Sequence, residues 1–368
     1  MPNCEIGFVW RNPEMPGRFA AGICLHGHTM HSEECLNFLP RYLYQVPGVS
    51  QIVRRKEAAG VDFARAYWTP PLSPASALRL EREQIAGLGL LPVVSLTDHD
   101  NIEAGLTLQV ARDRRETPVS VEWTVPYEGS IFHLGIHNLP AGMEREWLRL
   151  MAGYTAAPND GLLAELLDGL ASIPGALVVL NHPFWLEEGI TEAMHARALP
   201  LFLARYLPWM QAFELNGTRS WSENARAAAL ATDYGRPAIS GGDRHGCEPS
   251  ACLNLTNARS FAAFAEEIKA GESTILFMPQ YRESMALRVL ETAWDILKPY
   301  PEYPQRSQWT ERIFYRGADD VARPLAELWK GRAPWTLQAT AALVELFARG
   351  PLRPALRMLL MKRGEVLP

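Results

Sequence analysis

The stretch CLHGHTMHSEE, residues 24–34, joins the end of an apolar run to a group of histidines and glutamates. It contains three of the nine histidines of the chain. Because side chains alternate along a strand, His26 and His28 are expected to point the same way. Two imidazoles on one face of a strand suit a metal ion, but a polar strand end rich in histidine explains this stretch equally well. The rest of the sequence must decide between the two interpretations.

Similar apolar runs that end in polar residues recur along the chain, with helical patterns between many of them. The runs lie at 19–29, 90–100, 117–125, 130–139, 175–185, 211–217 and 235–246. The helical patterns lie at 74–88, 101–116, 143–151, 160–171 and 222–234. Strands that alternate with helices predict an α/β fold with a mainly parallel sheet or barrel. In a barrel, the C-terminal ends of the strands are where active sites form.

Composition and charge exclude several classes of protein. The chain has 368 residues, of which 48% are hydrophobic, and its net charge is −5. It has no overall basic field, so we expect no binding to long duplex nucleic acid. Its five cysteines form no C-x-x-C pair, which argues against a disulfide framework or a zinc knuckle. The sequence shows no signal peptide and no apolar run of membrane length, so we predict a cytoplasmic protein without a membrane anchor.

Two segments depart from the alternation of strands and helices. Residues 36–72 are interpreted as an insertion, either a lid over the site or a packing element. From residue 281 to 368 the pattern is helical, and its last part is predicted to pack on the barrel, with a membrane-surface helix as the alternative. The predicted organisation is a hydrolase barrel over 1–280, with the insertion, and a helical C-terminal extension over 281–368.

Most of the histidines fall at the expected strand ends, together with several acidic residues. The histidines are His26, His28, His99, His133, His182 and His245. The acidic residues are Asp98, Asp100, Glu122, Glu214 and Asp243. Neutral imidazole and carboxylate together bind Mn²⁺, Zn²⁺ or Fe²⁺. The set exceeds what a single ion needs, so it predicts two or three divalent metal ions.

Four motifs in this set resemble those of the PHP (polymerase and histidinol phosphatase) family of metal-dependent phosphoesterases. They are HGHTMHSE (26–33), TDHD (97–100), NHP (181–183) and GDRHG (242–246), and the resemblance covers about residues 20–275. It implies a distorted (βα)7-type barrel with a trinuclear metal centre at the C-terminal ends of the strands.

The resemblance also implies three neighbouring ion sites. Their ligands would be His26, His28, Glu33, His99, Glu122, His133, His182, Asp243 and His245. Glu122 would bridge two of the ions, and Glu33 would complete the third site. Glu33 stands where the family has an aspartate, and His31 or Glu34 is the alternative ligand.

The predicted activity is hydrolysis of a phosphate ester by a metal-bridging hydroxide. Two cations would offset the charge of the substrate and lower the pKa of a bridging water to about 7. Asp98 is a candidate to orient His99 or to shuttle a proton, and Glu122 is a candidate catalytic residue. The candidate substrate contacts are Arg219, Arg244 and Asn216; structural salt bridges explain the arginines, and turn chemistry explains Asn216, equally well.

The substrate expected for such a phosphoesterase is a small-molecule phosphate ester, a nucleotide or an oligonucleotide end. The sequence does not indicate the oligomeric state. One alternative is an amidohydrolase-like enzyme that cleaves amides or other esters. Many such enzymes bridge two metals with a carbamylated lysine, and Lys56 is the only lysine ahead of Lys269 in this chain. A second alternative is a non-catalytic, metal-stabilised scaffold, which the nearly complete ligand set argues against.

Overall fold

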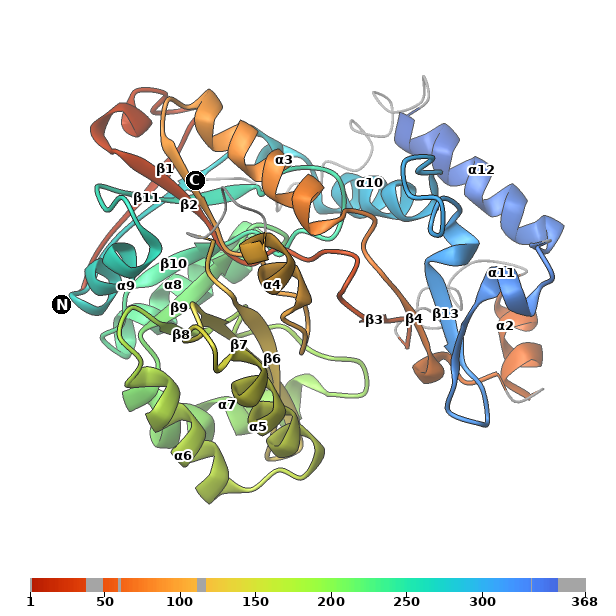
Figure 1. Cartoon of the computed structure of the whole chain (residues 1–368), viewed down its shortest axis with the longest axis horizontal. Helices are drawn as coiled ribbons and strands as arrows, with labels where there is room; N and C mark the ends of the chain where they lie inside the picture. The colour runs from red at the N-terminus through yellow and green to blue at the C-terminus, as the bar shows by residue number, and fades with distance from the viewer. Residues whose placement is uncertain (1, 38–48, 59–60, 111–116, 332, 350–368) are drawn as a thin grey trace.

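A computed structural model describes residues 2–37, 49–58, 61–110, 117–331 and 333–349 (Figure 1). The chain forms an α/β structure with two five-stranded mixed sheets and a smaller four-stranded sheet. The first sheet has the order β1 (Asn3–Phe8), β12 (Glu272–Phe277), β11 (Cys252–Thr256), β2 (Ala21–Cys24), β5 (Leu91–Val94). The second has the order β10 (Ala238–Gly241), β9 (Ala212–Asn216), β8 (Leu177–Leu180), β7 (Ser130–His137), β6 (Val121–Tyr127).

The seven predicted strand runs each overlap one of these strands, but the two sheets do not close into a barrel within the described residues. Strand β2 pairs in parallel with β5, and β8 pairs in parallel with β9 and β9 with β10, whereas β6, β7 and β8 are antiparallel neighbours. Beyond their strand ends the sheets are joined by isolated bridges, Gly27 with Arg244 and His99 with Glu122, and by single backbone hydrogen bonds. The ladders stop because His26 and Asp243, just after β2 and β10, have positive φ and cannot extend a strand.

Helices cover the outer faces of the two sheets. They are α3 (Pro74–Gly87), α4 (Glu103–Val110), α5 (Glu144–Ala156), α6 (Asp160–Ala171), α7 (Glu192–Tyr206), α8 (Trp221–Asp233) and α9 (Phe261–Lys269). Five of them match the predicted helical patterns, while α7 and α9 lie outside those patterns. Capping by polar side chains explains where several begin; Ser73 accepts a hydrogen bond from the backbone of Ser76 at the start of α3. Apolar faces such as Leu163 and Leu167 of α6 complete the core.

The small sheet joins two distant parts of the sequence, with the order β14 (Ala322–Pro324), β13 (Ile313–Arg316), β4 (Ala66–Trp68), β3 (Glu34–Cys35). Figure 1 shows β3, just before the insertion, and β4, within it, beside β13 of the C-terminal extension, at the right of the view. The sequence predicts helices throughout 281–368, whereas the structure has the two strands β13 and β14 in this region. The periodicity of such short strands is too brief to stand out from a helical pattern.

The helices of these segments are α2 (Val49–Ala58), α10 (Met285–Leu297), α11 (Leu325–Leu328) and α12 (Trp335–Arg349). The main packing partner of α12 is α10, so this helix packs within the extension and not on the barrel as predicted. The rest of the predicted last helix, 350–368, and positions 38–48 and 59–60 of the insertion lie outside the described residues. No helix in the described part of the chain has the length and apolarity to cross a membrane.

Candidate metal centre

Nine side chains that can bind metals meet where the two large sheets approach each other. They come from the segments after β2, β5, β8 and β10, from β6 and β7 themselves, and from β3. Their ligand atoms form four groups, within each of which the atoms lie no more than 4.8 Å apart. The groups are His28–Glu34–His99–His245, His26–Glu122–His182, His26–His28–Asp243 and His99–Glu122–His133. Residues far apart in sequence therefore converge on one centre.

The carboxylate of Glu122, fully buried on β6, lies between two sets of imidazoles. Its Oε2 atom is 2.8–3.4 Å from one ring nitrogen of each of His26, His28 and His99. Its Oε1 atom is 3.0–3.4 Å from ring nitrogens of His182 and His133. A carboxylate whose two oxygens face separate sets of imidazoles is arranged to bridge two cations.

Several of these separations fit metal coordination better than direct hydrogen bonding. The nitrogens of His28, His99 and His133 are each 3.4 Å from an oxygen of Glu122. Two ligands of a tetrahedral zinc ion are about 3.3 Å apart, whereas N–H···O hydrogen bonds are usually about 2.9 Å long. Among the described residues, His28 Nε2 and His133 Nδ1 are buried and have no hydrogen-bond partner. Because an unpaired buried nitrogen is costly, the donor set fits divalent ions.

Three of the ligands that follow strands have strained backbone. His26, His182 and Asp243 have φ values of 60°, 25° and 49°. Left-handed backbone at residues other than glycine is uncommon and costs about 1–3 kcal/mol. Here it turns the chain sharply out of each ladder and brings the three side chains into the centre.

Glu34 and not Glu33 is the acidic residue that joins His28, His99 and His245, which corrects the sequence prediction. An oxygen of Glu34 is 3.1 Å from His245 Nε2 and 3.6 Å from His99 Nε2. Glu33 instead forms an exposed ion pair with Arg316 at 2.7 Å. Glu34 begins β3, and side chains alternate along a strand, so its neighbour points the opposite way.

A polar shell behind the ligands orients them. Glu214 Oε2 is 2.7 Å from His26 Nδ1, an arrangement that fixes the orientation of the ring. Asn216, predicted as a substrate contact, donates to Asp243 Oδ2 at 3.1 Å, and Thr218 donates to the same oxygen at 2.9 Å. The structure thus places Asn216 in support of Asp243. A Cβ at Gly241 would collide with the carboxylate of Glu214, so only glycine leaves room for it.

Asp98 supports the centre in a different way from the one predicted. Its buried carboxylate accepts hydrogen bonds from the backbone N–H and the hydroxyl of Thr29. Burial raises the pKa of Asp98 to about 6, although the hydrogen bonds from Thr29 lower it. Asp98 therefore anchors the segment after His28, and its hydrogen bonds go to Thr29 and not to the ring of His99.

The two predicted phosphate-binding arginines have different environments. Arg244 is buried and donates to Glu81 Oε1, Gly246 O and His28 O at 2.9–3.1 Å. The structural interpretation of Arg244 is therefore the one that holds. Arg219 lies at the edge of the centre, where its Nη2 is 3.2 Å from Asp243 and its guanidinium is 3.8 Å from the ring centroid of Trp185. Arg219 remains a candidate substrate contact.

The carboxylates control the protonation of the centre when no ion is bound. Burial lowers the pKa of His133 and His245, but Glu122 and Glu34 overcome this effect and raise each pKa to about 9. Burial and the nearby His245 lower the pKa of His28 to about 3. Burial raises the pKa of Glu122, but the imidazoles around it hold that pKa well below its usual range.

Metal binding is expected to release protons, because the nearby carboxylates keep His26, His133 and His245 protonated at pH 7 and each must lose a proton to become a ligand. We expect a release of roughly three protons per chain near pH 7, which falls as the pH rises past about 9, and a metal affinity that rises with pH over the same range. Calorimetric titration of metal-free protein in two buffers with different ionisation enthalpies measures this number. A heat that does not depend on the buffer contradicts the prediction.

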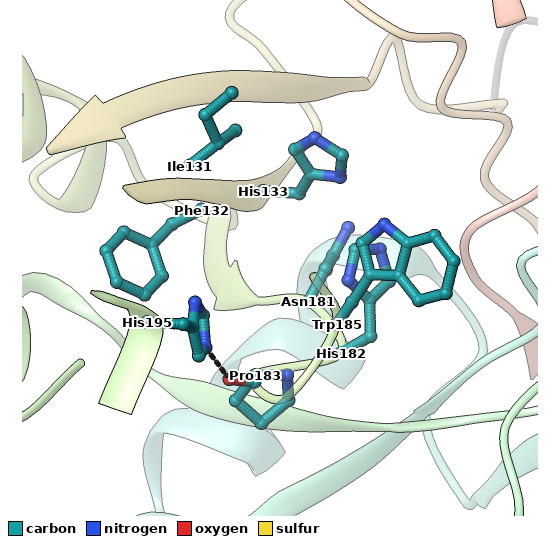
Figure 2. A pocket seen from close by; sticks show the side chains of 8 residues that line it. All are labelled: Ile131, Phe132, His133, Asn181, His182, Pro183, Trp185 and His195. Carbon is teal, nitrogen blue, oxygen red and sulfur yellow. Dashed lines mark hydrogen bonds between the residues drawn. The ribbon is translucent and has the colours of Figure 1, made fainter. Parts of the chain in front are cut away.

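Two further histidines are satisfied by hydrogen bonds outside the centre. His195 on α7 donates from Nε2 to the carbonyl of Pro183 at 2.8 Å, and its Nδ1 is 2.9 Å from Ser130 Oγ. Figure 2 shows it across a small pocket from His133 and His182. His137 is buried, with its Nδ1 2.8 Å from Ser95 Oγ. These contacts give both residues a structural explanation.

Comparison with known proteins does not assign the chain to a family. No family model and no curated protein matches the sequence. Solved structures with some likeness include PsfC from Pseudomonas syringae, with 12% identity, a TM-score of 0.43 and coverage of 75% of this chain and 97% of that one. A putative metal-dependent phosphoesterase from Bifidobacterium adolescentis has 14% identity, a TM-score of 0.34 and coverage of 55% and 92%. An amidohydrolase from Chromobacterium violaceum, with bound sulfate and no metal, has 16% identity, a TM-score of 0.40 and coverage of 70% of this chain and 98% of that one. Because these TM-scores are low, the likeness carries no argument about function, which must come from the side-chain geometry.

Proposed function

We propose that this protein is a metal-dependent hydrolase that cleaves phosphate esters. The observation that carries the proposal is the buried carboxylate of Glu122, with imidazoles facing each of its two oxygens. Two unpaired buried imidazole nitrogens face the same carboxylate. Divalent ions bound there would polarise a phosphoryl oxygen and lower the pKa of water to near neutrality.

The residues of the chain prepare the ligands for this role. Glu214 faces Nδ1 of His26 at 2.7 Å and holds the ring so that Nε2 faces Glu122 and would be the nitrogen that binds an ion once its proton is lost. Asn181 donates to Glu122 Oε1 at 2.9 Å and restrains the carboxylate from behind. Asn216 and Thr218 hold Asp243 in the same manner. The ligands are therefore positioned before an ion arrives.

The charge of the centre favours an anionic substrate. The clustered ligands include only three carboxylates, those of Glu34, Glu122 and Asp243. Three divalent ions would exceed this negative charge and leave a positive surplus, which suits a phosphate dianion better than a neutral amide. Arg219 at the edge of the centre adds a further positive charge. We propose as substrate a small-molecule phosphate ester, a nucleotide or an oligonucleotide end.

Chelation is expected to abolish hydrolysis of a generic phosphate monoester or diester, by roughly a thousandfold or more, and added Mn²⁺ or Zn²⁺ is expected to restore it. The assay compares chelated, dialysed protein with and without each metal, on phosphate esters and on matched amides. Thermal melts of each preparation control for unfolding. Full activity of the chelated protein contradicts the metal mechanism, whereas metal-dependent cleavage of amides alone would select the amidohydrolase-like alternative.

A further inference from the structure

The ligands of the centre differ in what holds them in place. We call Glu122 with His26, His133 and His182 the Glu122 group, and His28, Glu34, His99 and His245 the Glu34 group. The Glu122 group stands on or directly after strands β2, β6, β7 and β8 of the two large sheets. Two members of the Glu34 group, Glu34 and His245, lie in segments that the C-terminal extension contacts directly.

The extension holds Glu34 through the small sheet. Glu34 pairs with Trp68 of β4, and Trp68 in turn pairs with Ile313 of β13. One residue before Glu34, Glu33 forms its 2.7 Å ion pair with Arg316, at the end of β13. The strand that carries this ligand is only two residues long, so its position depends on these neighbours.

Two arginines of the extension fix the segments on either side of this strand. Arg306 donates from Nη1 to the carbonyl of Met30 at 2.8 Å and to Thr69 Oγ1 at 3.3 Å. Arg312 is fully buried, and its carbonyl accepts from the backbone of Thr69 at 2.9 Å. Its guanidinium donates to four carbonyls of the extension, those of Ile296, Lys298, Arg306 and Ser307. These contacts tie the loop before Glu34 to the body of the extension.

The extension also holds the segment after His245. Asp295 of α10 is buried, and its Oδ2 atom accepts from the backbone N–H of Cys247 at 2.7 Å. Its other oxygen pairs with Lys298 at 2.7 Å. The chain between His245 and Cys247 is a single glycine, so Asp295 restrains the backbone next to the ligand. Trp68, from the sheet shared with the extension, packs near the ring of His245, with ring centroids 6.0 Å apart.

We infer that the C-terminal extension is part of the metal centre: it sets the affinity of the Glu34 group for an ion and leaves that of the Glu122 group unchanged. This inference rests on the proposed metal centre. The inference assigns a function to two positioning residues. Asp295 acts through the backbone of Cys247, and Arg316 acts through Glu33.

The test measures metal content and affinity, ion by ion, in full-length Asp295→Ala and Arg316→Ala variants. Mn²⁺ or Zn²⁺ per chain is determined by elemental analysis after dialysis against graded concentrations of chelator. We expect one ion to bind roughly 10- to 100-fold more weakly than in the wild type, with the remaining ions unchanged. Glu34→Gln removes the ligand itself and should weaken the same ion.

Arg145→Ala is the matched control, because Arg145 forms an exposed 2.7 Å ion pair with Glu103 between α5 and α4, neither of which belongs to the extension. It should bind every ion as the wild type does. Thermal melts exclude unfolding, and Arg316, part-exposed at the end of β13, keeps the test decisive if Asp295→Ala folds poorly. Unchanged affinity for all ions, or equal weakening of all ions, overturns the inference. A wild-type protein that binds no ions overturns the proposed function instead.

Discussion

Replacement of Glu122 by glutamine is expected to lower the hydrolytic rate roughly a thousandfold or more and to reduce the number of bound ions. The change keeps the size of the side chain but removes its negative charge, and it offers an amide N–H₂ where an oxygen faces imidazoles. Both oxygens of Glu122 are engaged, so the loss affects ligands on both sides of the centre. The rate on a phosphate ester and the metal content per chain measure the effect.

The matched control is Glu165→Gln, which makes the same chemical change at an exposed position on α6. It should leave both rate and metal content at wild-type values. A Glu122→Gln protein that is folded, fully loaded with metal and fully active contradicts the bridging role. The scaffold alternative is favoured by a different result: the wild type has no activity on any ester or amide, and the folded variant loses metal.

Arg244→Ala is expected to reduce the free energy of unfolding by about 3–5 kcal/mol, because it leaves the carboxylate of Glu81 buried without its partner. Arg244 and Glu81 are 3% and 1% exposed and are joined at 2.9 Å. Glu81 keeps its hydrogen bonds from the backbone of Ser250, but these carry no positive charge to balance the buried carboxylate. Urea unfolding of the metal-free variant and wild type measures the difference.

The double variant Glu81→Leu with Arg244→Met separates the two interpretations of Arg244. It replaces the buried pair by apolar side chains and should recover much of the lost stability. Arg219→Ala, in contrast, should raise KM for the phosphate ester while changing stability little. If Arg244→Ala unfolds like the wild type but shows a raised KM, the arginine contacts substrate as the sequence suggested.

The strands and helices around the centre could be predicted because their patterns are local. Several of the seven apolar runs end in polar residues, and each overlaps a strand in the structure. Eight of the nine predicted ligand positions also meet in space, because imidazoles and carboxylates at strand ends are visible as residue types in the sequence. The strands β1, β11 and β12 were not predicted, since no polar residues of the centre mark their ends.

The positions that prediction missed depend on partners far away in the sequence. The choice between Glu33 and Glu34 follows from pairing of β3 with β4 and from Arg316, far along the chain in the extension. The structural role of Arg244 follows from Glu81, which is 163 residues away. The positive φ of His26 and Asp243, where the chain leaves β2 and β10, is a local feature that the residue types do not reveal.

Anomalous diffraction from crystals grown with Mn²⁺ or Zn²⁺ tests the central claim most directly. The account predicts at least one ion on each side of the Glu122 carboxylate, each about 2.0–2.2 Å from an imidazole nitrogen, and a third beside Glu34. Anomalous peaks absent from this region, with the histidines bonded only to carboxylates, would contradict it.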